Sequence, residues 1–216
     1  MRLKTACCII TMLFFAGTVL PAAKEMQSIQ LLKPRMSGGK PLMQALKERQ
    51  TLRNISSKEL PAQIFSDLLW AAFGVNRPEI GKRTAPSAVN WQEMDIYVAT
   101  PKGLYLYNAK ENMLEPLVSH DIRPLCNMQP AALTAPVVLL YVADYLKMGK
   151  AQKEMKDFYS AADTGFISQN VYLFCASEGL ATVVMGAIDK DRLSKEMNLR
   201  AEQKVILVQP VGYPRQ

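Results

Sequence analysis

The chain is poor in the residues that build metal sites and disulfide frameworks. It has one histidine and four cysteines in 216 residues. A lone histidine, His120, excludes a multi-histidine metal site, and we interpret it as a surface loop residue. Cys7 and Cys8 lie in an apolar N-terminal run, which leaves only Cys126 and Cys175 in the rest of the chain. One pair is no disulfide framework, and Cys175 lies in an apolar stretch where a buried thiol is expected.

The sequence also lacks internal repeats, low-complexity segments and a basic tract. Its formal net charge is +7, but the positive residues are scattered along the chain. No zinc spacing, basic arm or aromatic RNA platform accompanies them, so the charge does not favour a nucleic-acid partner. Hydrophobic residues at 49% and charged residues at 21% are ordinary for a globular protein, and the length suits one domain of moderate size.

The N-terminus has the layout of a secretory signal. Arg2 and Lys4 precede an apolar run over residues 6–20, and an alanine pair follows it. We therefore predict a signal peptide over residues 1–23 and export of the mature protein, to a periplasm, with no membrane contact of the mature domain. The alternative is an uncleaved membrane anchor formed by residues 6–20.

Residues 24–40 contain proline, serine and two adjacent glycines, and we interpret them as an extended arm. One domain follows over residues 41–216. It begins with a helix over 41–48 that has Pro41 at its first position, where the missing N–H costs nothing. The next helix is expected to be capped by Ser56 or Ser57 and to end at Gly74. Its apolar positions are Leu60, Ile64, Leu68 and Ala72.

The remaining elements predict an α+β fold, with helices around a central, mostly antiparallel sheet. Residues 77–92 form a loop long enough to be functional, and residues 108–134 are mixed. The other elements are a hairpin over 94–109, a strand over 135–144 buried on both faces, a central buried helix over 154–178 closed by Gly179, a short helix from Asp189 to about Met197, and a last strand over 204–214.

Several segments acquire meaning only from their order and spacing, since each alone is typical of an ordinary turn or helix end. They are ERQTLRN (48–54), FSDLLWAAFGVNRP (65–78), GKRTAPSAVNWQEMDIYV (81–98), GLYLYNA (103–109), DTGFISQNVYLFCASEGLATV (163–183) and VGYP (211–214). Together, over about residues 40–215, the chain resembles the FMN-dependent nitroreductase family. The tryptophan-containing helix, the RTAPSA loop and the tyrosine hairpin look closest to the branch that includes the azoline dehydrogenases.

The resemblance implies a phosphate grip at the start of the domain. Arg49, Thr51 and Arg53 match the family's Arg-x-Ser-x-Arg, which holds the phosphate and ribityl chain of FMN. Guanidiniums present forked donors to phosphate oxygens, and the hydroxyl adds another donor. Gln50 stands where many relatives have a basic residue, so it lowers the local charge. Near the C-terminus, Arg215 matches a basic residue that commonly reaches the same phosphate.

Two further segments match the family's flavin contacts. Pro86, Ser87 and Asn90 match its Pro-Ser-x-x-Asn loop, whose asparagine donates to and accepts from the flavin's pyrimidine edge. The alternative for Asn90 is that it satisfies its own turn. Met185 and Gly186 match the segment that passes under the isoalloxazine and offers a backbone N–H toward N5. Relatives often have a charged side chain where Met185 stands.

The resemblance also implies an activity. It predicts an FMN-dependent oxidoreductase, an intertwined homodimer, with ping-pong hydride transfer from NAD(P)H through flavin N5 to a nitroaromatic, quinone or similar acceptor. Residues 24–40 are in a position to embrace the partner subunit. No side chain is assigned a catalytic role, since flavin chemistry needs no obligatory protein acid or base. The alternatives are a flavin-dependent dehydrogenase that oxidises its substrate and a flavin-binding module without turnover. Because NAD(P)H is scarce outside the cytoplasm, export implies another donor, whereas an anchor could leave the domain inside.

Overall fold

The computed structural model of the chain describes residues 26–126 and 131–215, so the predicted signal over 1–23 lies outside the described residues. A seven-stranded sheet forms its centre, in the order β1-β6-β5-β4-β7-β9-β8, and every pairing in it is antiparallel. Its strands are β1 (Ile29–Gln30), β4 (Met94–Thr100), β5 (Gly103–Asn108), β6 (Met113–Val118), β7 (Val137–Asp144), β8 (Ala181–Thr182) and β9 (Gln203–Gly212). The predicted α+β class is confirmed.

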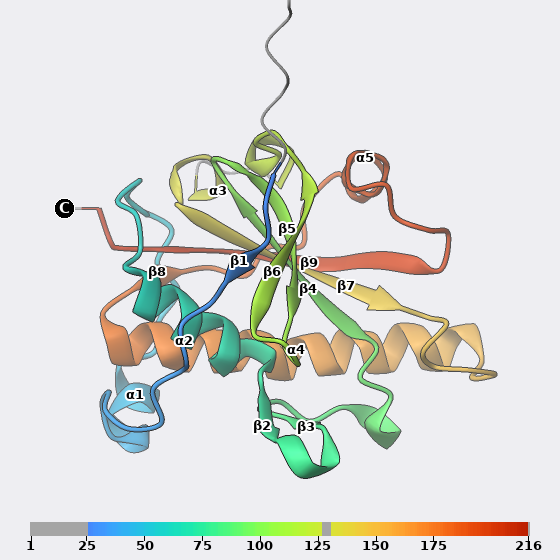
Figure 1. Cartoon of the computed structure of the whole chain (residues 1–216), viewed down its shortest axis with the longest axis horizontal. Helices are drawn as coiled ribbons and strands as arrows, with labels where there is room; N and C mark the ends of the chain where they lie inside the picture. The colour runs from blue at the N-terminus through green and yellow to red at the C-terminus, as the bar shows by residue number, and fades with distance from the viewer. Residues whose placement is uncertain (1–25, 127–130, 216) are drawn as a thin grey trace, which may run out of the picture.

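Helices cover both faces of this sheet. The helices are α1 (Leu42–Glu48), α2 (Ala62–Phe73), α3 (Ala131–Thr134), α4 (Lys153–Glu178) and α5 (Lys190–Glu196). Figure 1 shows α1, α2 and α4 on one side and α3 and α5 on the other. Alternate residues of β4 and β7 therefore enter two separate cores, one against α2 and α4 and one against α3 and α5. Every residue of β7 is buried, as predicted for a central strand.

Local sequence signals position several elements correctly. The β4–β5 hairpin pairs Thr100 with Gly103, as expected. Gly179 ends α4 in the left-handed conformation, with φ of 69°, and its N–H donates to the Cys175 carbonyl. The Asp189 side chain accepts the Arg192 N–H at 3.0 Å and caps α5. These ends depend on neighbouring residues alone, which explains why the sequence predicts them.

The expected cap of α2 is wrong. The helix begins at Ala62, after Pro61, and neither Ser56 nor Ser57 caps it. Ser56 instead donates its backbone N–H to the Tyr213 carbonyl at 2.8 Å, because this segment pairs with the C-terminal tail. Leu60 consequently precedes the helix and packs beside its apolar face.

The segment expected to be a loop has structure of its own. β2 (Val75–Arg77) and β3 (Lys82–Arg83) form a small antiparallel hairpin, and a 3-10 turn follows over Ala88–Asn90. The mixed stretch over 108–134 contains β6 and α3. The helix α4 has an exposed side as well as a buried one, with Phe158 67% and Phe166 48% exposed. It is therefore not enclosed within the single chain.

The arm before residue 41 packs against its own domain. β1 pairs with β6, and Leu31 is buried. The carboxylate of Asp67 on α2 accepts the backbone N–H of Arg35 at 2.9 Å and its side-chain Nε at 2.7 Å. The Lys40 N–H donates to the Ser177 hydroxyl at 2.8 Å, near the end of α4. These contacts join the arm to α2 and α4.

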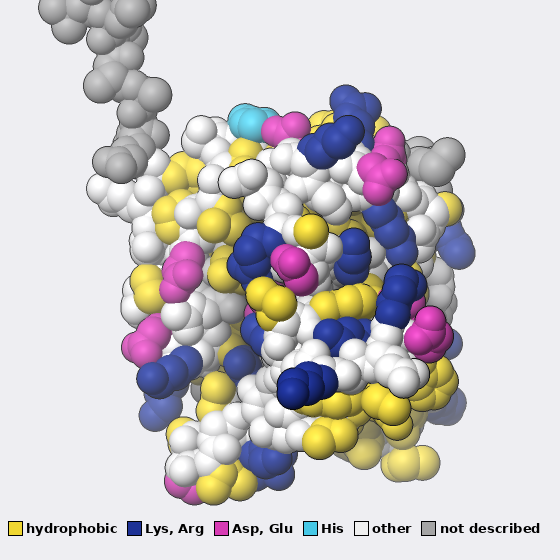
Figure 2. All heavy atoms as spheres, turned by 90° about the vertical axis from the view of Figure 1, so that its right-hand side faces the viewer, with side chains coloured by type: hydrophobic (Ala, Val, Ile, Leu, Met, Phe, Trp, Pro, Cys, Tyr) yellow, Lys and Arg dark blue, Asp and Glu magenta, His cyan; other side chains and the backbone are white. Residues whose placement is uncertain are grey.

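The side of the molecule to the right in Figure 1, where α5 and the start of α4 lie, is charged and hollowed. Figure 2 shows Lys and Arg side chains spread over it, with Asp and Glu side chains between them. A cavity of about 530 Å³ lies among Lys153, Asp157, Arg200 and Lys204. Lys153 and Asp157 form an ion pair at 2.5 Å, so part of this charge is neutralised locally. Over residues 26–126 and 131–215, no helix combines the length and apolar character that crossing a bilayer requires.

Candidate functional site

The segment after α1 runs beside the end of the sheet and the C-terminal tail. The Leu52 N–H donates to the Thr182 carbonyl of β8 at 3.0 Å, and Ile55 forms a bridge with Pro214. The Arg215 N–H donates to the Asn54 carbonyl at 2.9 Å. The tail therefore places Arg215, which is exposed, next to the Arg-Thr-Arg segment.

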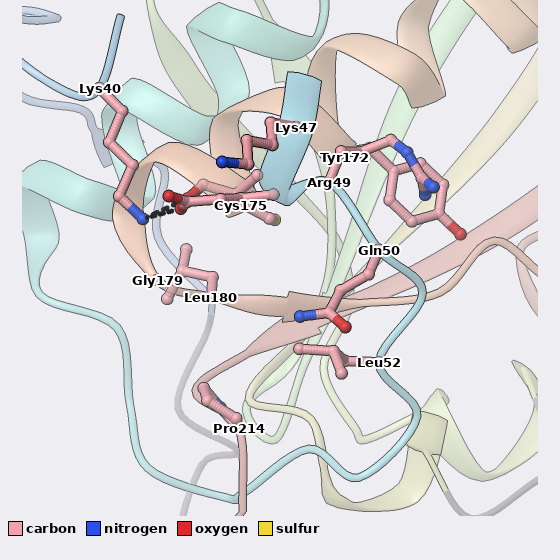
Figure 3. A pocket seen from close by; sticks show the side chains of 12 residues that line it. Lys40, Lys47, Arg49, Gln50, Leu52, Tyr172, Cys175, Gly179, Leu180 and Pro214 are labelled. Atoms are coloured by element: carbon pink, nitrogen blue, oxygen red, sulfur yellow. Dashed lines mark hydrogen bonds and ion pairs between the residues drawn. The ribbon is translucent and has the colours of Figure 1, made fainter. Parts of the chain in front are cut away.

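Tyr172 on α4 is the centre of this region. Its phenol oxygen lies 3.2 Å from the Thr51 hydroxyl and accepts the Val184 backbone N–H at 3.0 Å. The guanidinium carbon of Arg49 lies 5.5 Å from the centroid of the tyrosine ring (Figure 3). A cation over an aromatic face is attracted by the ring's negative surface. Sequence reasoning missed Tyr172, because its position in α4 has the same periodicity as the helix's core residues.

A cavity of about 470 Å³ opens beside Arg49. Figure 3 shows the side chains that line it, including Lys40, Lys47, Arg49, Gln50, Leu52 and Tyr172. Lys40 is paired with Glu48 at 2.5 Å and also donates to the Ala176 carbonyl. Within the described part of the chain, no carboxylate pairs with Arg49 or Arg53. Arg49 lines the cavity together with Lys40 and Lys47, and the exposed Thr51 and Arg53 follow in the same segment. A cavity lined by these cations suits the predicted anion, a phosphate.

In the segment after β8, Met185 and Gly186 differ in whether their backbone N–H is free to contact a ligand. The Met185 N–H donates to the Val208 carbonyl at 2.8 Å, and its side chain is buried in the core against α5. Its N–H is thus used by the sheet. Gly186 is exposed, and its N–H has no protein acceptor among the hydrogen bonds of the described residues. Of the two residues, Gly186 is the one whose donor can reach a ligand.

The loop over residues 86–92 is held by its own side chains. The Ser87 hydroxyl donates to the Glu93 carboxylate at 3.1 Å and accepts the Gln92 N–H at 2.8 Å. Most of its hydrogen-bonding capacity is therefore used within the protein. Asn90 has φ of 59°, and its Oδ1 accepts the Gln92 side chain at 3.1 Å. The amide of Asn90 thus satisfies part of its own turn while its exposed Nδ2 is left to donate. Pro86 is exposed at the start of the loop.

The two halves of the predicted site lie apart in one chain. Asp163 on α4 accepts the Ala88 N–H at 2.9 Å and so marks the loop's place along the helix. Tyr172, beside the arginines, comes nine residues later. At about 1.5 Å per residue and 3.6 residues per turn, this is about 13 Å farther along the helix, on its opposite side. The loop of one chain therefore does not reach that chain's own cavity near Arg49.

Other reactive side chains have structural surroundings. Burial raises the pKa of the Cys175 thiol well above its usual value, which keeps it protonated and unreactive. His120 is exposed and lies 2.7 Å from Glu196, which confirms its place in a surface loop. In residues 26–126 and 131–215, no three His, Cys, Asp or Glu side chains are grouped so that they could hold a metal ion.

Comparison with known proteins agrees with the fold. The sequence profile described as the Nitroreductase family matches residues 46–213. A protein of Methanocaldococcus jannaschii described as a nitroreductase is 29% identical over 181 residues, covering 79% of this chain and 90% of that protein.

Solved structures give the same result. A crystal structure of a protein from Ralstonia eutropha JMP134, described as a nitroreductase, has a TM-score of 0.85 and 36% identity, and the match covers 90% of this chain and 92% of that one. The NADPH:FMN oxidoreductase from Vibrio harveyi has a TM-score of 0.61 and 17% identity, over 81% of this chain and 69% of that one, and shares the fold. The match is to the family as a whole, so the azoline dehydrogenase branch stays a prediction. This chain belongs to the nitroreductase family.

Proposed function

We propose that the protein is an FMN-dependent oxidoreductase. The observation that carries this proposal is Arg49, which has no carboxylate partner among the described residues and lines a cavity of about 470 Å³. Thr51 and Arg53 follow it in the same segment and are exposed. Charge-assisted hydrogen bonds from arginine to phosphate are among the stronger polar contacts in proteins. Family membership and the fold of a NADPH:FMN oxidoreductase support the same cofactor.

Each residue of this site has a task that its surroundings support. Arg49 is oriented by the face of Tyr172, and Thr51 by the phenol oxygen. Arg53 and Arg215 are exposed beside the same segment and can add donors to a phosphate. Gly186 offers a backbone N–H without a side chain in the way. When bound, FMN would supply hydride transfer from NAD(P)H to a nitroaromatic, quinone or similar acceptor.

We further propose that the working unit is a homodimer. A single chain leaves the loop with Asn90 on the opposite side of α4 from Arg49, so a second copy is needed to bring such a loop to the cavity. Exposed apolar side chains on α1 and α4 support this arrangement. They are Leu42 (64%), Met43 (75%), Leu46 (44%), Phe158 (67%) and Phe166 (48%).

The absorbance spectrum of the purified protein tests the cofactor. We expect a yellow protein, or one that takes up added FMN, and bleaching by NADH or NADPH without air. A flavin reduced by dithionite but not by nicotinamides would indicate another electron donor. A colourless protein that takes up no FMN would contradict the proposal.

The location of the protein sets its electron donor. We propose that it is exported, on the strength of the charged, apolar and small-residue order of residues 1–23. Fractionation of the native cell, with N-terminal sequencing of the recovered protein, tests this. A mature chain starting near residue 24 in the exported fraction is expected. An intact N-terminus in the membrane fraction would favour the anchor formed by residues 6–20.

A further inference from the structure

Two carboxyl groups lie buried side by side beneath the loop over residues 86–92. Glu93 is 0% exposed and Asp163 on α4 is 2% exposed. No Lys or Arg of the described chain forms an ion pair with either one. One oxygen of Glu93, Oε1, is buried without a hydrogen-bond partner. Buried carboxylates are normally paired with a cation or protonated, so this pair needs an explanation.

Both carboxylates of the pair accept hydrogen bonds from residues of the loop. The Asp163 carboxylate accepts the Ala88 N–H at 2.9 Å, and the Glu93 carboxylate accepts the Ser87 hydroxyl at 3.1 Å. Each acid thus holds one of two consecutive loop residues. Tyr145, in the segment after β7, lies near Glu93. Burial and the hydrogen bond to Asp157 raise the pKa of its phenol, and the Glu93 charge adds to this rise.

Lys156 on α4 does not neutralise the pair. Its ammonium donates to the Tyr145 and Gly149 carbonyls and lies 6.0 Å from the centroid of the Tyr145 ring. The pKa of Glu93 is raised to about 7, chiefly by burial and in part by the neighbouring Asp163 carboxyl. Two adjacent buried carboxyls cannot both ionise without a large cost.

We propose that Glu93 and Asp163 share one proton, and that this proton keeps the loop over residues 86–92 docked on α4, which makes both acids positioning residues for Asn90. The role of Asn90 toward the flavin rests on the proposed function. The docking itself does not, because it involves only groups of this chain.

Loss of the proton to solvent leaves two negative charges in contact. Undocking of the loop relieves them, since water then reaches both carboxylates. The loop is also strained: Val89, Asn90 and Gln92 have φ of 52°, 59° and 47°. Non-glycine residues keep such angles only where their surroundings hold them. The hydrogen bonds to Ser87 and Ala88 are therefore the anchors whose release frees the loop.

Trp91 reports on this loop without any flavin. Its ring packs edge-on against Tyr159 of α4, with 5.7 Å between centroids. The chain has one other tryptophan, Trp70, so a Trp70→Phe background isolates the signal. In flavin-free protein, acrylamide quenching of Trp91 is measured from about pH 5 to about pH 9. We expect quenching to rise about twofold or more, with a midpoint near neutrality.

Glu93→Gln is the matched variant, since it keeps a donor between the two groups and removes one charge. It should give low quenching that does not change with pH. Asp163→Asn is the second variant and should flatten the profile in the same way, so the test does not depend on one variant folding. An unchanged midpoint in a folded variant, or no pH dependence in the parent, overturns the proposal.

Parallel FMN titrations separate this inference from the proposed function. If the quenching transition is present and no FMN binds, the shared proton of Glu93 and Asp163 is supported and the cofactor assignment fails. If FMN binds and quenching does not respond to pH, the cofactor assignment is supported and the shared-proton proposal fails. If both hold, we expect FMN affinity to fall above neutrality in the parent and to be level in Glu93→Gln.

Discussion

The phenol oxygen of Tyr172 lies 3.2 Å from the hydroxyl of Thr51, although the two residues are 121 positions apart in sequence. The same oxygen accepts the Val184 N–H, so one side chain joins the segment after α1 to the segment after β8. These are the segments proposed to hold the phosphate and to face the flavin ring. Tyr172 therefore sets their relative position.

Replacing Tyr172 by phenylalanine should loosen this junction. The variant leaves the Val184 N–H without its acceptor, which typically costs about 1–3 kcal/mol of unfolding free energy, less where water can enter. Urea denaturation of the flavin-free protein measures this cost. Tyr213→Phe is the control, because the Tyr213 ring contacts Lys58 through its face, which phenylalanine keeps. Equal stabilities of the two variants would contradict the role given to the Tyr172 hydroxyl.

The two arginines should account for much of the FMN affinity. We expect Arg49→Ala and Arg53→Ala each to raise the dissociation constant about 10- to 100-fold, the range expected for a lost hydrogen bond to a charged group. Fluorescence quenching of added FMN measures it. Arg77→Ala, at an exposed position on β2, controls for the loss of one positive charge. If affinity in the double variant matches that of Arg77→Ala, the proposed phosphate grip is wrong.

Mixing two defective variants tests whether a second copy completes the site. Arg49→Ala/Arg53→Ala and Asn90→Ala are unfolded together and refolded as a mixture. If Arg49 and Asn90 of one site come from different chains, each mixed dimer holds one intact site, and about one quarter of all sites should bind FMN. If both residues come from the same chain, the mixture should bind no more than its components do separately.

Stability should fall as pH rises toward neutrality. The folded-state pKa of Glu93, about 7, lies above its ordinary value of 4.5, so the folded protein binds the proton more tightly than the unfolded chain. The resulting stabilisation is complete below about pH 4.5 and is lost as pH rises through about 7, by roughly 3 kcal/mol at most. Thermal unfolding across this window measures it. Glu93→Gln should show a flatter profile and greater stability than the parent at pH 8, and a parallel profile would contradict the assignment.

The arm should be released by loss of Asp67. This carboxylate is 5% exposed and receives the Arg35 backbone and side chain as well as the Gln63 amide. Asp67→Ala removes all three bonds, and limited proteolysis should then cut faster between residues 33 and 40. Glu48→Ala, which removes the exposed pair with Lys40, is the control and should change the cutting little. Equal protection in both variants would show that the arm is held elsewhere.

Elements with local causes were predictable from the sequence. The end of α4 at Gly179 needs only a residue that tolerates a left-handed conformation, and the start of α5 needs only the Asp189 side chain. The predicted start of α2 was wrong because two serines match the pattern of a helix cap but neither of them caps the helix. Ser56 is instead drawn into pairing with Tyr213, a contact across 157 positions that no local pattern shows.

The sequence by itself determined the kinds of residues available to the site: Arg49, Thr51 and Arg53 in one short segment, and an asparagine loop before β4. Only the tertiary structure decided which of them meet. It set Tyr172 between Thr51 and Val184, placed Asp163 under Ala88, and put the loop and the arginines on opposite sides of α4. The physical reason is that hydrogen bonds and burial act over a few ångströms in space, whereas sequence patterns record only neighbours along the chain.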